Sequence, residues 1–359
     1  MQEIPRVLFI GELPPLTTNG ISNMNAQFID ILKSRYNVEI IEDYPNKSIF
    51  LRLFYFIYSF RFVQLDLFEY FYMNLPVSKS GALRICIISI FLRLRNRKVI
   101  FHLHRGDVDR LKSKTHRILF AVFFRRCRIV VLGESYRKTL EEYFPFLDFY
   151  VVNNFLVEKL DAVKFTKKKQ TKFIYYSNIL KTKGIMSFIS IADSFEFKSE
   201  QYDFEIYGCE IEKGLLVDLP SNCSYKGSIT STKDKNLMFA HADCLLFLSQ
   251  NEGCSLVVME AMRSGLPIIC FNVGMNLEML GLDYEYLLDE FDLQSVISSV
   301  SSFSAMSIED RDLLSEEIIG RSSHLYSEEM ASQYFLSVFD SIRFLKLTDP
   351  DTLSRRVRS

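Results

Sequence analysis

Several signatures that would assign a function at once are missing from the sequence. The loop after the first apolar stretch carries neither GxGxxG nor GxxxxGK[ST], so a dinucleotide-binding or P-loop protein loses its main support. There is no low-complexity run, and a formal net charge of -1 argues against a general nucleic-acid binder. The apolar stretches never reach the ~18 uninterrupted residues of a membrane span, because arginines interrupt them at Arg52, Arg61, Arg84 and Arg93.

Cysteine usage and the first residues indicate a reducing compartment. The seven cysteines are odd in number and include no CxxC pair, which is typical of small core side chains and not of a disulfide framework. Residues 1–15 hold acid and proline where a secretory signal would place a basic and then an apolar stretch. We therefore expect a cytoplasmic protein.

The even total charge conceals a basic, aromatic segment. Residues 51–128 contain sixteen Lys or Arg against four Asp or Glu, and the stretch FLRLFYFIYSFRF at residues 50–62 interleaves arginine with large aromatic side chains. This composition suits the interface of an anionic membrane. Solvated helix faces around an ordinary core explain the same pattern, so both interpretations remain open.

Short apolar strands alternate with amphipathic helices along the chain, which implies parallel sheets covered by helices on both faces. A lysine-rich break at residues 161–172 separates two such series. The pattern predicts two doubly wound α/β domains with ligand sites at the carboxyl ends of their strands. Strands are expected at residues 6–12, 38–43, 98–104, 128–134, 149–154, 172–178, 203–208, 223–229, 243–249 and 266–272.

An apolar helix is expected at residues 255–264, between a capping serine and a terminating glycine. Glu260 lies inside it, and a buried ionised carboxylate costs several kcal/mol unless its oxygens are satisfied. The start of the same helix offers free amides and a second carboxylate to a phosphate or a sugar, in the segment Glu252, Gly253, Cys254, Ser255 and Leu256.

Two further strand ends carry features that suit an anion. Asn19-Gly20 can adopt positive φ before a helix that begins near Ile21, which leaves backbone amides free. Lys181 and Lys183 lie between a strand and a helix N-terminus, where an anionic ligand would relieve an unfavourable interaction with the helix dipole. A pair of solvated lysines is the alternative.

His102 and His104 alternate on one strand and so point the same way. With Asp107 or Asp109 they could bind a metal, and these two aspartates also form a DxD triplet that could chelate a metal-bound nucleotide diphosphate. We favour a single functional histidine, acting as base or hydrogen-bond donor in a cleft, over a metal site or a structural pair. A second acidic triplet, DPD at residues 349–351, lies in a polar tail and is expected to be solvated.

The segment from Glu252 to Pro267 reads E-G-x-x-L-V-x-x-E-A-M-x-x-G-x-P and resembles the signature of the retaining glycosyltransferases of family 4. The resemblance also covers the front loop, HLH, YVVNN, SNILKTKG, FEIYG, YKGSIT and ADCLLFLS, roughly residues 5–345. It implies a GT-B fold, in which two Rossmann-like domains face each other across a cleft. The domains would be an acceptor-binding one at 1–165 and a nucleotide-sugar-binding one at 166–335, with a helix returning towards the first domain and a polar tail at 336–359.

Carried over residue by residue, the resemblance assigns Glu260 to the ribose hydroxyls of a nucleotide sugar and Glu252 to hydroxyls of the donor sugar. Lys183 neutralises the diphosphate by electrostatics in place of a metal. His104 contacts the donor sugar near its anomeric carbon and is preferred to His102, which lies one step back from the glycine turn. Glu260 is then expected to be held by water in the empty protein.

Three departures from the family pattern bear on the site. Ser177-Asn178 stands where Gly-Arg is usual, so an arginine on the diphosphate is missing. By its place in the pattern Asn178 is still expected to contact the donor, and Lys181 is the candidate substitute for the missing charge. Asn19-Gly20 stands for Gly-Gly in the front loop, where Gly20 approaches the phosphates, and Gly274-Met275 stands for the Gly-Gly after the last strand.

The resemblance implies transfer of a hexose or N-acetylhexosamine from a UDP or GDP sugar to an acceptor hydroxyl, with retention and without a metal or other cofactor. The basic first domain suggests a lipid-linked glycan or an oligosaccharide as acceptor, at the cytoplasmic face of the inner membrane, in bacterial surface polysaccharide (O-antigen or capsule) biosynthesis. No nucleic acid is expected as partner. The alternatives are a nucleotide-sugar epimerase or hydrolase on the same fold and an inactive nucleotide-sugar-binding protein.

Overall fold

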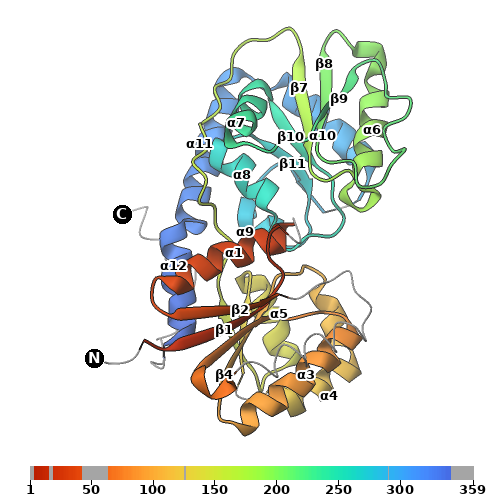
Figure 1. Cartoon of the computed structure of the whole chain (residues 1–359). Helices are drawn as coiled ribbons and strands as arrows, with labels where there is room; N and C mark the ends of the chain where they lie inside the picture. Colours follow the sequence, from red (N-terminus) through yellow and green to blue (C-terminus); the bar gives the residue numbers. More distant parts are fainter. Residues whose placement is uncertain (1–3, 16–18, 43–63, 125–126, 290, 341–359) are drawn as a thin grey trace.

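A computed structural model describes residues 4–15, 19–42, 64–124, 127–289 and 291–340 of the chain. They form two sheets of six strands, in the orders β2-β1-β3-β4-β5-β6 and β12-β11-β10-β7-β8-β9. All the pairings between these strands are parallel. Helices cover both faces of each sheet (Figure 1), as parallel strands require.

The first sheet is built from the N-terminal part of the chain. Its strands are β1 (Arg6–Gly11), β2 (Asn37–Glu42), β3 (Tyr70–Asn74), β4 (Lys98–Leu103), β5 (Arg128–Val131) and β6 (Asp148–Val151). The connecting helices are α1 (Gly20–Lys33), α3 (Lys79–Leu94), α4 (Lys114–Phe123) and α5 (Glu134–Tyr143), with 3-10 turns η1 (Leu65–Leu67) and η2 (Val108–Lys112).

The second sheet follows after residues 152–170. Its strands are β7 (Thr171–Tyr176), β8 (Tyr202–Tyr207), β9 (Cys223–Gly227), β10 (Cys244–Phe247), β11 (Ile268–Phe271) and β12 (Leu287–Leu288). Around it lie η3 (Lys181–Lys183), α6 (Ile185–Ser194), η4 (Glu196–Lys198), α7 (Thr232–His241), α8 (Leu256–Ser264), α9 (Asn276–Leu280), α10 (Leu293–Ala305) and α11 (Ile308–Leu325).

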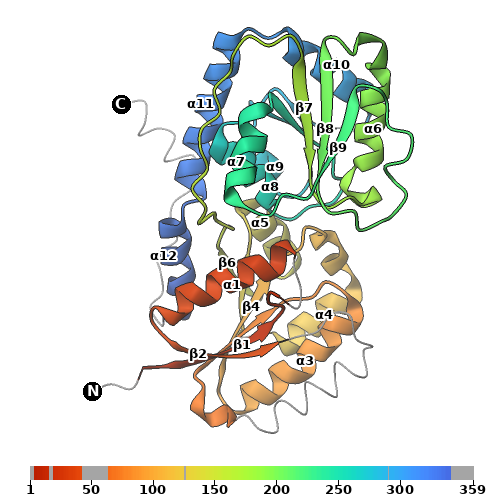
Figure 2. The ribbon, with the colours of Figure 1, turned by 45° about the horizontal axis from the view of Figure 1, so that its top comes forward.

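The last helix, α12 (Glu328–Phe339), returns to the first sheet and packs beside α1. Figures 1 and 2 show α11 and α12 running along one side of the molecule, past both sheets. Phe335 is fully buried and contacts the rings of Phe28, Tyr72 and His102. The chain therefore crosses between the sheets twice, and its second crossing completes the core of the first domain.

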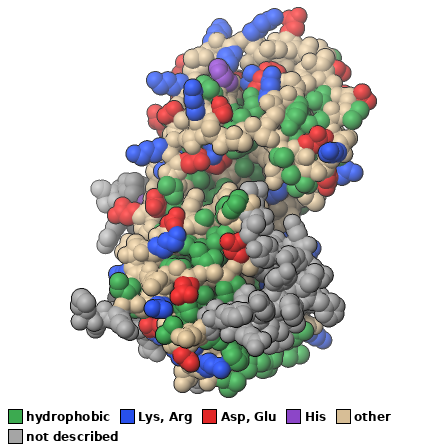
Figure 3. All heavy atoms as spheres, viewed as in Figure 1, with side chains coloured by type: hydrophobic (Ala, Val, Ile, Leu, Met, Phe, Trp, Pro, Cys, Tyr) green, Lys and Arg blue, Asp and Glu red, His purple; other side chains and the backbone are tan. Residues whose placement is uncertain are grey.

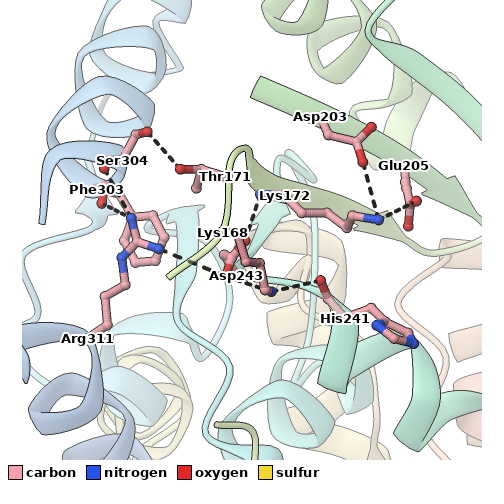
Figure 4. A network of polar contacts seen from close by, with 10 residues as sticks. All are labelled: Lys168, Thr171, Lys172, Asp203, Glu205, His241, Asp243, Phe303, Ser304 and Arg311. Carbon is pink, nitrogen blue, oxygen red and sulfur yellow. Dashed lines mark hydrogen bonds and ion pairs between the residues drawn. The ribbon is translucent and has the colours of Figure 1, made fainter. Parts of the chain in front are cut away.

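A buried polar network fixes the entry into the second sheet (Figure 4). Asp243 is 1% exposed. It accepts a hydrogen bond from the Lys172 amide (2.8 Å) and forms an ion pair with Lys168 (2.9 Å). Arg311 of α11 lies 3.8 Å from the same carboxylate and donates to the carbonyl oxygens of Phe303 and Ser304. The network lies at the start of β7 and β10, at the opposite end of these strands from the site described below, so we assign it a structural role.

Apolar side chains are exposed on the two neighbouring helices α3 and α4. The exposed fraction reaches 80% for Leu94 and 65% for Ile118, and Figure 3 shows hydrophobic side chains gathered at the end of the first domain where α3 lies. Exposed apolar groups on adjacent helices are unusual for a surface that contacts only water. Residues 50–62, which the sequence also marks as basic and aromatic, lie outside the described part.

None of the helices in the described part of the chain is long and apolar enough to cross a membrane.

Candidate functional site

The carboxyl ends of both sheets meet at one place, where the segment Glu252–Ser255 before α8 lies against loops of the first domain. A Cβ added to Gly106 would lie 1.5 Å from the Glu252 carbonyl oxygen, so only glycine permits this approach. The Tyr136 hydroxyl donates to the same oxygen (3.3 Å), and Asn154 Nδ2 donates to the Cys254 carbonyl oxygen (3.0 Å). Three elements of the first domain thus hold one segment of the second.

A second contact between the domains is a helix cap made in trans. The Glu278 carboxylate of α9 accepts hydrogen bonds from the amides of Glu134 (2.9 Å) and Ser135 (3.0 Å) at the start of α5. Gly133 itself offers no capping side chain. A carboxylate at a helix N-terminus satisfies free amides and interacts favourably with the helix dipole, so Glu278 stabilises the contact between the two domains.

Lys183 and Glu252 form a direct ion pair at this junction. Lys183 Nζ lies 2.7 Å from Glu252 Oε1, and the side chains are 30% and 10% exposed. Lys183 comes from η3 after β7, and Glu252 comes from the loop after β10, so the parallel order of the strands brings them together. The two residues that the sequence assigns to a diphosphate and a sugar therefore neutralise each other.

Glu260 of α8 is buried as predicted, but a lysine side chain holds its carboxylate. Lys235 Nζ of α7 lies 2.7 Å from Glu260 Oε1 and 2.6 Å from Glu158 Oε2. Burial raises the pKa of the Glu260 carboxyl, and Lys235 opposes that rise. The expectation of a water-held carboxylate was therefore wrong, because a lysine from a distant segment reaches it.

His102 and His104 stack at the end of β4, with ring centroids 3.9 Å apart. The Tyr72 hydroxyl lies 2.7 Å from His102 Nδ1, while both ring nitrogens of His104 are buried without a hydrogen-bond partner among the described residues. Burial lowers the pKa of His104 to about 3, and burial together with His104 lowers the pKa of His102 well below its ordinary value. His104 is therefore neutral and has hydrogen-bonding capacity to offer a ligand.

A cavity of about 310 Å³ opens beside His104 on the first-domain side. Apolar side chains of the first sheet and of α3 form part of its lining, together with His102, Asn74 and the arginines Arg84, Arg105 and Arg110. Arg105 and Arg110 both pair with the Asp107 carboxylate, at 2.9 and 3.2 Å. Glu12 also lines the cavity, which can accept a polar group next to His104 and an apolar group against the side chains of α3.

The described residues give no support to a metal site at the histidines. Asp107 is engaged by two arginines and Asp109 by Lys112 (2.6 Å), and no group of three metal-ligating residues exists within the described ranges.

The front loop differs from the expectation at Asn19. Its φ is -139°, so it does not use the positive-φ region; its side chain instead accepts the Ser22 amide and caps α1. Asn19 caps the helix instead of adopting a left-handed turn, because its side chain has an oxygen that the glycine usual at this position in the family lacks. Gly20 nonetheless reaches the junction, since a Cβ built on it would lie 3.8 Å from Leu256 Cδ1.

Three other predicted residues make local contacts within the second domain. Asn178 is exposed, and its carbonyl oxygen accepts the Tyr175 hydroxyl (2.9 Å). The Lys181 amide donates to Glu212 (3.1 Å), and its side chain faces solvent. Ser255 caps α8, as predicted, through the Val258 amide (3.5 Å).

Sequence reasoning missed Lys235, Glu158, Tyr136, Asn154 and Glu278. Only Asn154 had a signal, because it lies in the YVVNN stretch that forms part of the family resemblance. The others act across the fold, and nothing in their local sequence distinguishes them from surface residues.

Residues 157–318 match the sequence profile of the family described as "Glycosyl transferases group 1". This supports a relationship of the chain to those glycosyltransferases over the second domain. No curated protein matches the sequence.

Solved structures match nearly the whole chain. Sucrose-phosphate synthase from Thermosynechococcus elongatus superposes with a TM-score of 0.74 at 13% identity, over 93% of this chain and 98% of that one. HepE from Anabaena, in a complex with UDP and glucose, gives 0.67 at 12% identity, over 94% and 100%. A TarM mutant from S. aureus, in complex with fondaparinux, alpha-GlcNAc-glycerol and UDP, gives 0.57 at 19% identity, over 76% and 55%.

These matches show the fold, which is GT-B as the sequence predicted: two parallel six-stranded sheets with helices on both faces. The assignment to family 4 and the role of the two glutamates remain predictions.

The buried histidines lead to a prediction about pH. Their pKa values lie below the ordinary ~6.5 of an unfolded chain, so the unfolded state binds protons first as the pH falls. These groups then leave the free energy of unfolding unchanged above pH ~6.5. As the pH drops below ~6.5, the free energy of unfolding decreases by up to about 1.4 kcal/mol per pH unit for each histidine. NMR signals of the two rings, assigned with H102Q and H104Q, should stay constant between pH 8 and 5. An inflection of either ring between pH 6 and 7 would contradict the burial described here.

Proposed function

We propose that the protein is a retaining glycosyltransferase that moves a hexose or N-acetylhexosamine from a UDP or GDP sugar to an acceptor hydroxyl. The observation that carries the proposal is the Lys183–Glu252 ion pair at the junction of the two sheets, directly before α8. The profile match supports the reaction class, and the complexes of HepE and TarM with UDP support a uridine nucleotide as donor.

The diphosphate of the donor would separate the ion pair. Lys183 would turn to the phosphate oxygens, and Glu252 would be released to accept hydrogen bonds from the sugar hydroxyls. Amides of Cys254, Ser255 and Leu256 at the start of α8, with Gly253 before them, would complete the phosphate and sugar contacts, and Gly20 would approach from the first domain. Glu260, one and a half turns further into the helix, would accept the ribose hydroxyls.

The reaction needs charge stabilisation more than a protein nucleophile. As the bond between the anomeric carbon and the phosphate oxygen breaks, negative charge grows on the diphosphate, and Lys183 stabilises it without a metal. The departing phosphate oxygen takes the proton of the acceptor hydroxyl, which attacks from the same face and so retains the anomeric configuration. The neutral His104 would orient the sugar by hydrogen bonding. Lys181 would supply the second positive charge that Asn178 does not.

The cavity beside His104 is the proposed acceptor site. Its mixture of apolar lining and arginines suits a lipid-linked glycan better than a free neutral sugar. The exposed apolar side chains of α3 and α4, with the basic residues of the same helices, would place the first domain on the anionic cytoplasmic face of the inner membrane. A role in bacterial surface polysaccharide assembly, such as O-antigen or capsule, would follow from such an acceptor.

Substitutions in the ion pair test the reaction. K183M and E252Q should each lower the rate of UDP release from a UDP sugar, measured with a glycolipid extract as acceptor, by about 10²-fold or more, because each removes a charge contact at the reacting group. K233M, at an exposed lysine of α7, is the matched control and should be unaffected. Addition of a chelator should leave the wild-type rate unchanged.

The same assay separates the alternatives. Sustained turnover to a free or epimerised sugar without acceptor would identify a hydrolase or epimerase, and nucleotide-sugar binding without any turnover would identify an inactive binding protein. Wild-type activity in K183M and E252Q would show that the site assignment is wrong. If the NMR coupling of the anomeric proton showed that the product has the opposite anomeric configuration to the donor, retention would be contradicted.

Vesicle flotation tests the membrane contact. The protein should bind vesicles of phosphatidylcholine with about 30% phosphatidylglycerol, bind pure phosphatidylcholine weakly, and dissociate from the anionic vesicles in high salt. L94E should reduce binding several-fold, whereas F197E, at an 80% exposed phenylalanine of the second domain, should not. Equal binding by both variants, or none by the wild type, would contradict a membrane role of α3.

A further inference from the structure

Lys235 is a buried cation that the proposed reaction does not use. Only 8% of the residue is exposed, and its ammonium nitrogen lies 2.7 Å from Glu260 Oε1 and 2.6 Å from Glu158 Oε2. A lysine is rarely buried unless it is paired, and here the pairing is with two carboxylates from separate segments. One ammonium between two carboxylates leaves the cluster with a net negative charge.

The three residues come from three different elements. Lys235 lies in the first turns of α7, Glu260 lies in α8, and Glu158 lies in the segment that joins the two sheets. A second contact ties the same segment to α7, where Asn236 Nδ2 donates to Asp161 (3.0 Å). Lys235 is therefore held in place by the joining segment and directed at Glu260.

Packing alone does not account for this arrangement. A buried ion pair contributes little net stability, since desolvation of the charges offsets their attraction, and an apolar side chain of similar size is often as stable. Lys235 Nζ joins the carboxylates of Glu260 and Glu158, and these two carboxylates raise the pKa of Tyr176 in β7 in addition to the larger effect of burial. Such a cluster beside a proposed ribose site indicates a role in binding.

We propose that Lys235 is a positioning residue of the nucleotide site: it fixes the Glu260 carboxylate in one charged orientation for the ribose hydroxyls, and Glu158 fixes Lys235. The inference rests on the proposed function, because it takes Glu260 as the ribose contact. Lys235 donates a hydrogen bond to Glu260 Oε1. Among the described residues no hydrogen bond to Glu260 Oε2 is found, so this oxygen can accept one from the ligand. The donor ribose would then meet one oxygen whose direction is already set, which lowers the entropy cost of binding.

The protonation of Glu260 depends on the same contact. Burial raises the pKa of the Glu260 carboxyl, Glu158 raises it further, and Lys235 lowers it. Loss of Lys235 would move this pKa upwards, and a protonated carboxyl accepts ribose hydroxyls less well. The ribose contribution to binding should therefore disappear at a higher pH without Lys235 than with it.

Calorimetric titration with UDP and with 2′-deoxy-UDP tests the inference, with GDP and 2′-deoxy-GDP as the second pair of probes. The wild type should bind the ribonucleotide about tenfold or more tightly than its deoxy form, as expected for a hydrogen bond to a charged group. In K235M this ratio should fall towards one, and the pH at which it is lost should rise. K235R should restore part of the ratio, and E158Q should give an intermediate value. K233M should keep the wild-type ratio.

The ratio of the affinities for the ribonucleotide and its deoxy form separates a positioning role of Lys235 from a role in attracting the diphosphate or in folding. If Lys235 only attracted the diphosphate, K235M would weaken both nucleotides equally and keep the ratio, which would overturn the inference while leaving the proposed function intact. A wild-type ratio in E158Q, which removes the charged partner of Lys235, would overturn it as well, and this variant decides the matter if K235M fails to fold. Equal binding of ribo and deoxy forms by the wild type would instead reject Glu260 as the ribose contact, and no binding of either nucleotide would reject the proposed function.

Discussion

The rest of the site depends on one contact, which the first domain makes with the Glu252–Ser255 segment. Gly106, Tyr136 and Asn154 fix this segment from one side, and Glu278 caps α5 across the same junction. Because Glu252 follows β10 and α8 follows Glu252, fixing the segment also fixes the start of α8 and the position of Glu260. The proposed donor site is thus assembled from the second domain but held in shape by the first.

Charges at this junction are paired with each other. Lys183 pairs with Glu252, and Lys235 pairs with both Glu260 and Glu158. Pairing avoids the large cost of leaving a partly buried charge without a partner. The two pairs differ in the role we assign them: the first must open for the diphosphate, whereas the second stays closed and orients a carboxylate. A single site can therefore combine one exchangeable ion pair with one permanent pair.

The sequence predicted the fold well because its signals are local. The expected segments correspond to β1, β2, β4 to β11 and the helix α8, while β3 and the short β12 were not singled out. Glu260 was predicted to be buried for the same reason, since apolar residues surround it on every side of its helix. Its partner could not be predicted, because Lys233 and Lys235 look alike in sequence and only the packing of α7 on α8 directs one of them inwards. The positive φ predicted for Asn19 was wrong, because asparagine favours helix capping as well as left-handed turns and here it caps α1.

The central claim is that the junction of the two sheets binds a nucleoside diphosphate sugar. The most direct measurement is the thermal unfolding midpoint in the presence of UDP-glucose, UDP-N-acetylglucosamine, GDP-mannose, NAD and ATP, each at millimolar concentration. A ligand at a hundred times its dissociation constant adds about 2.7 kcal/mol to stability, so the account predicts a clear rise of the midpoint with at least one nucleotide sugar and a smaller one, or none, with NAD and ATP. No rise with any nucleotide sugar, or an equal rise with NAD, would contradict it.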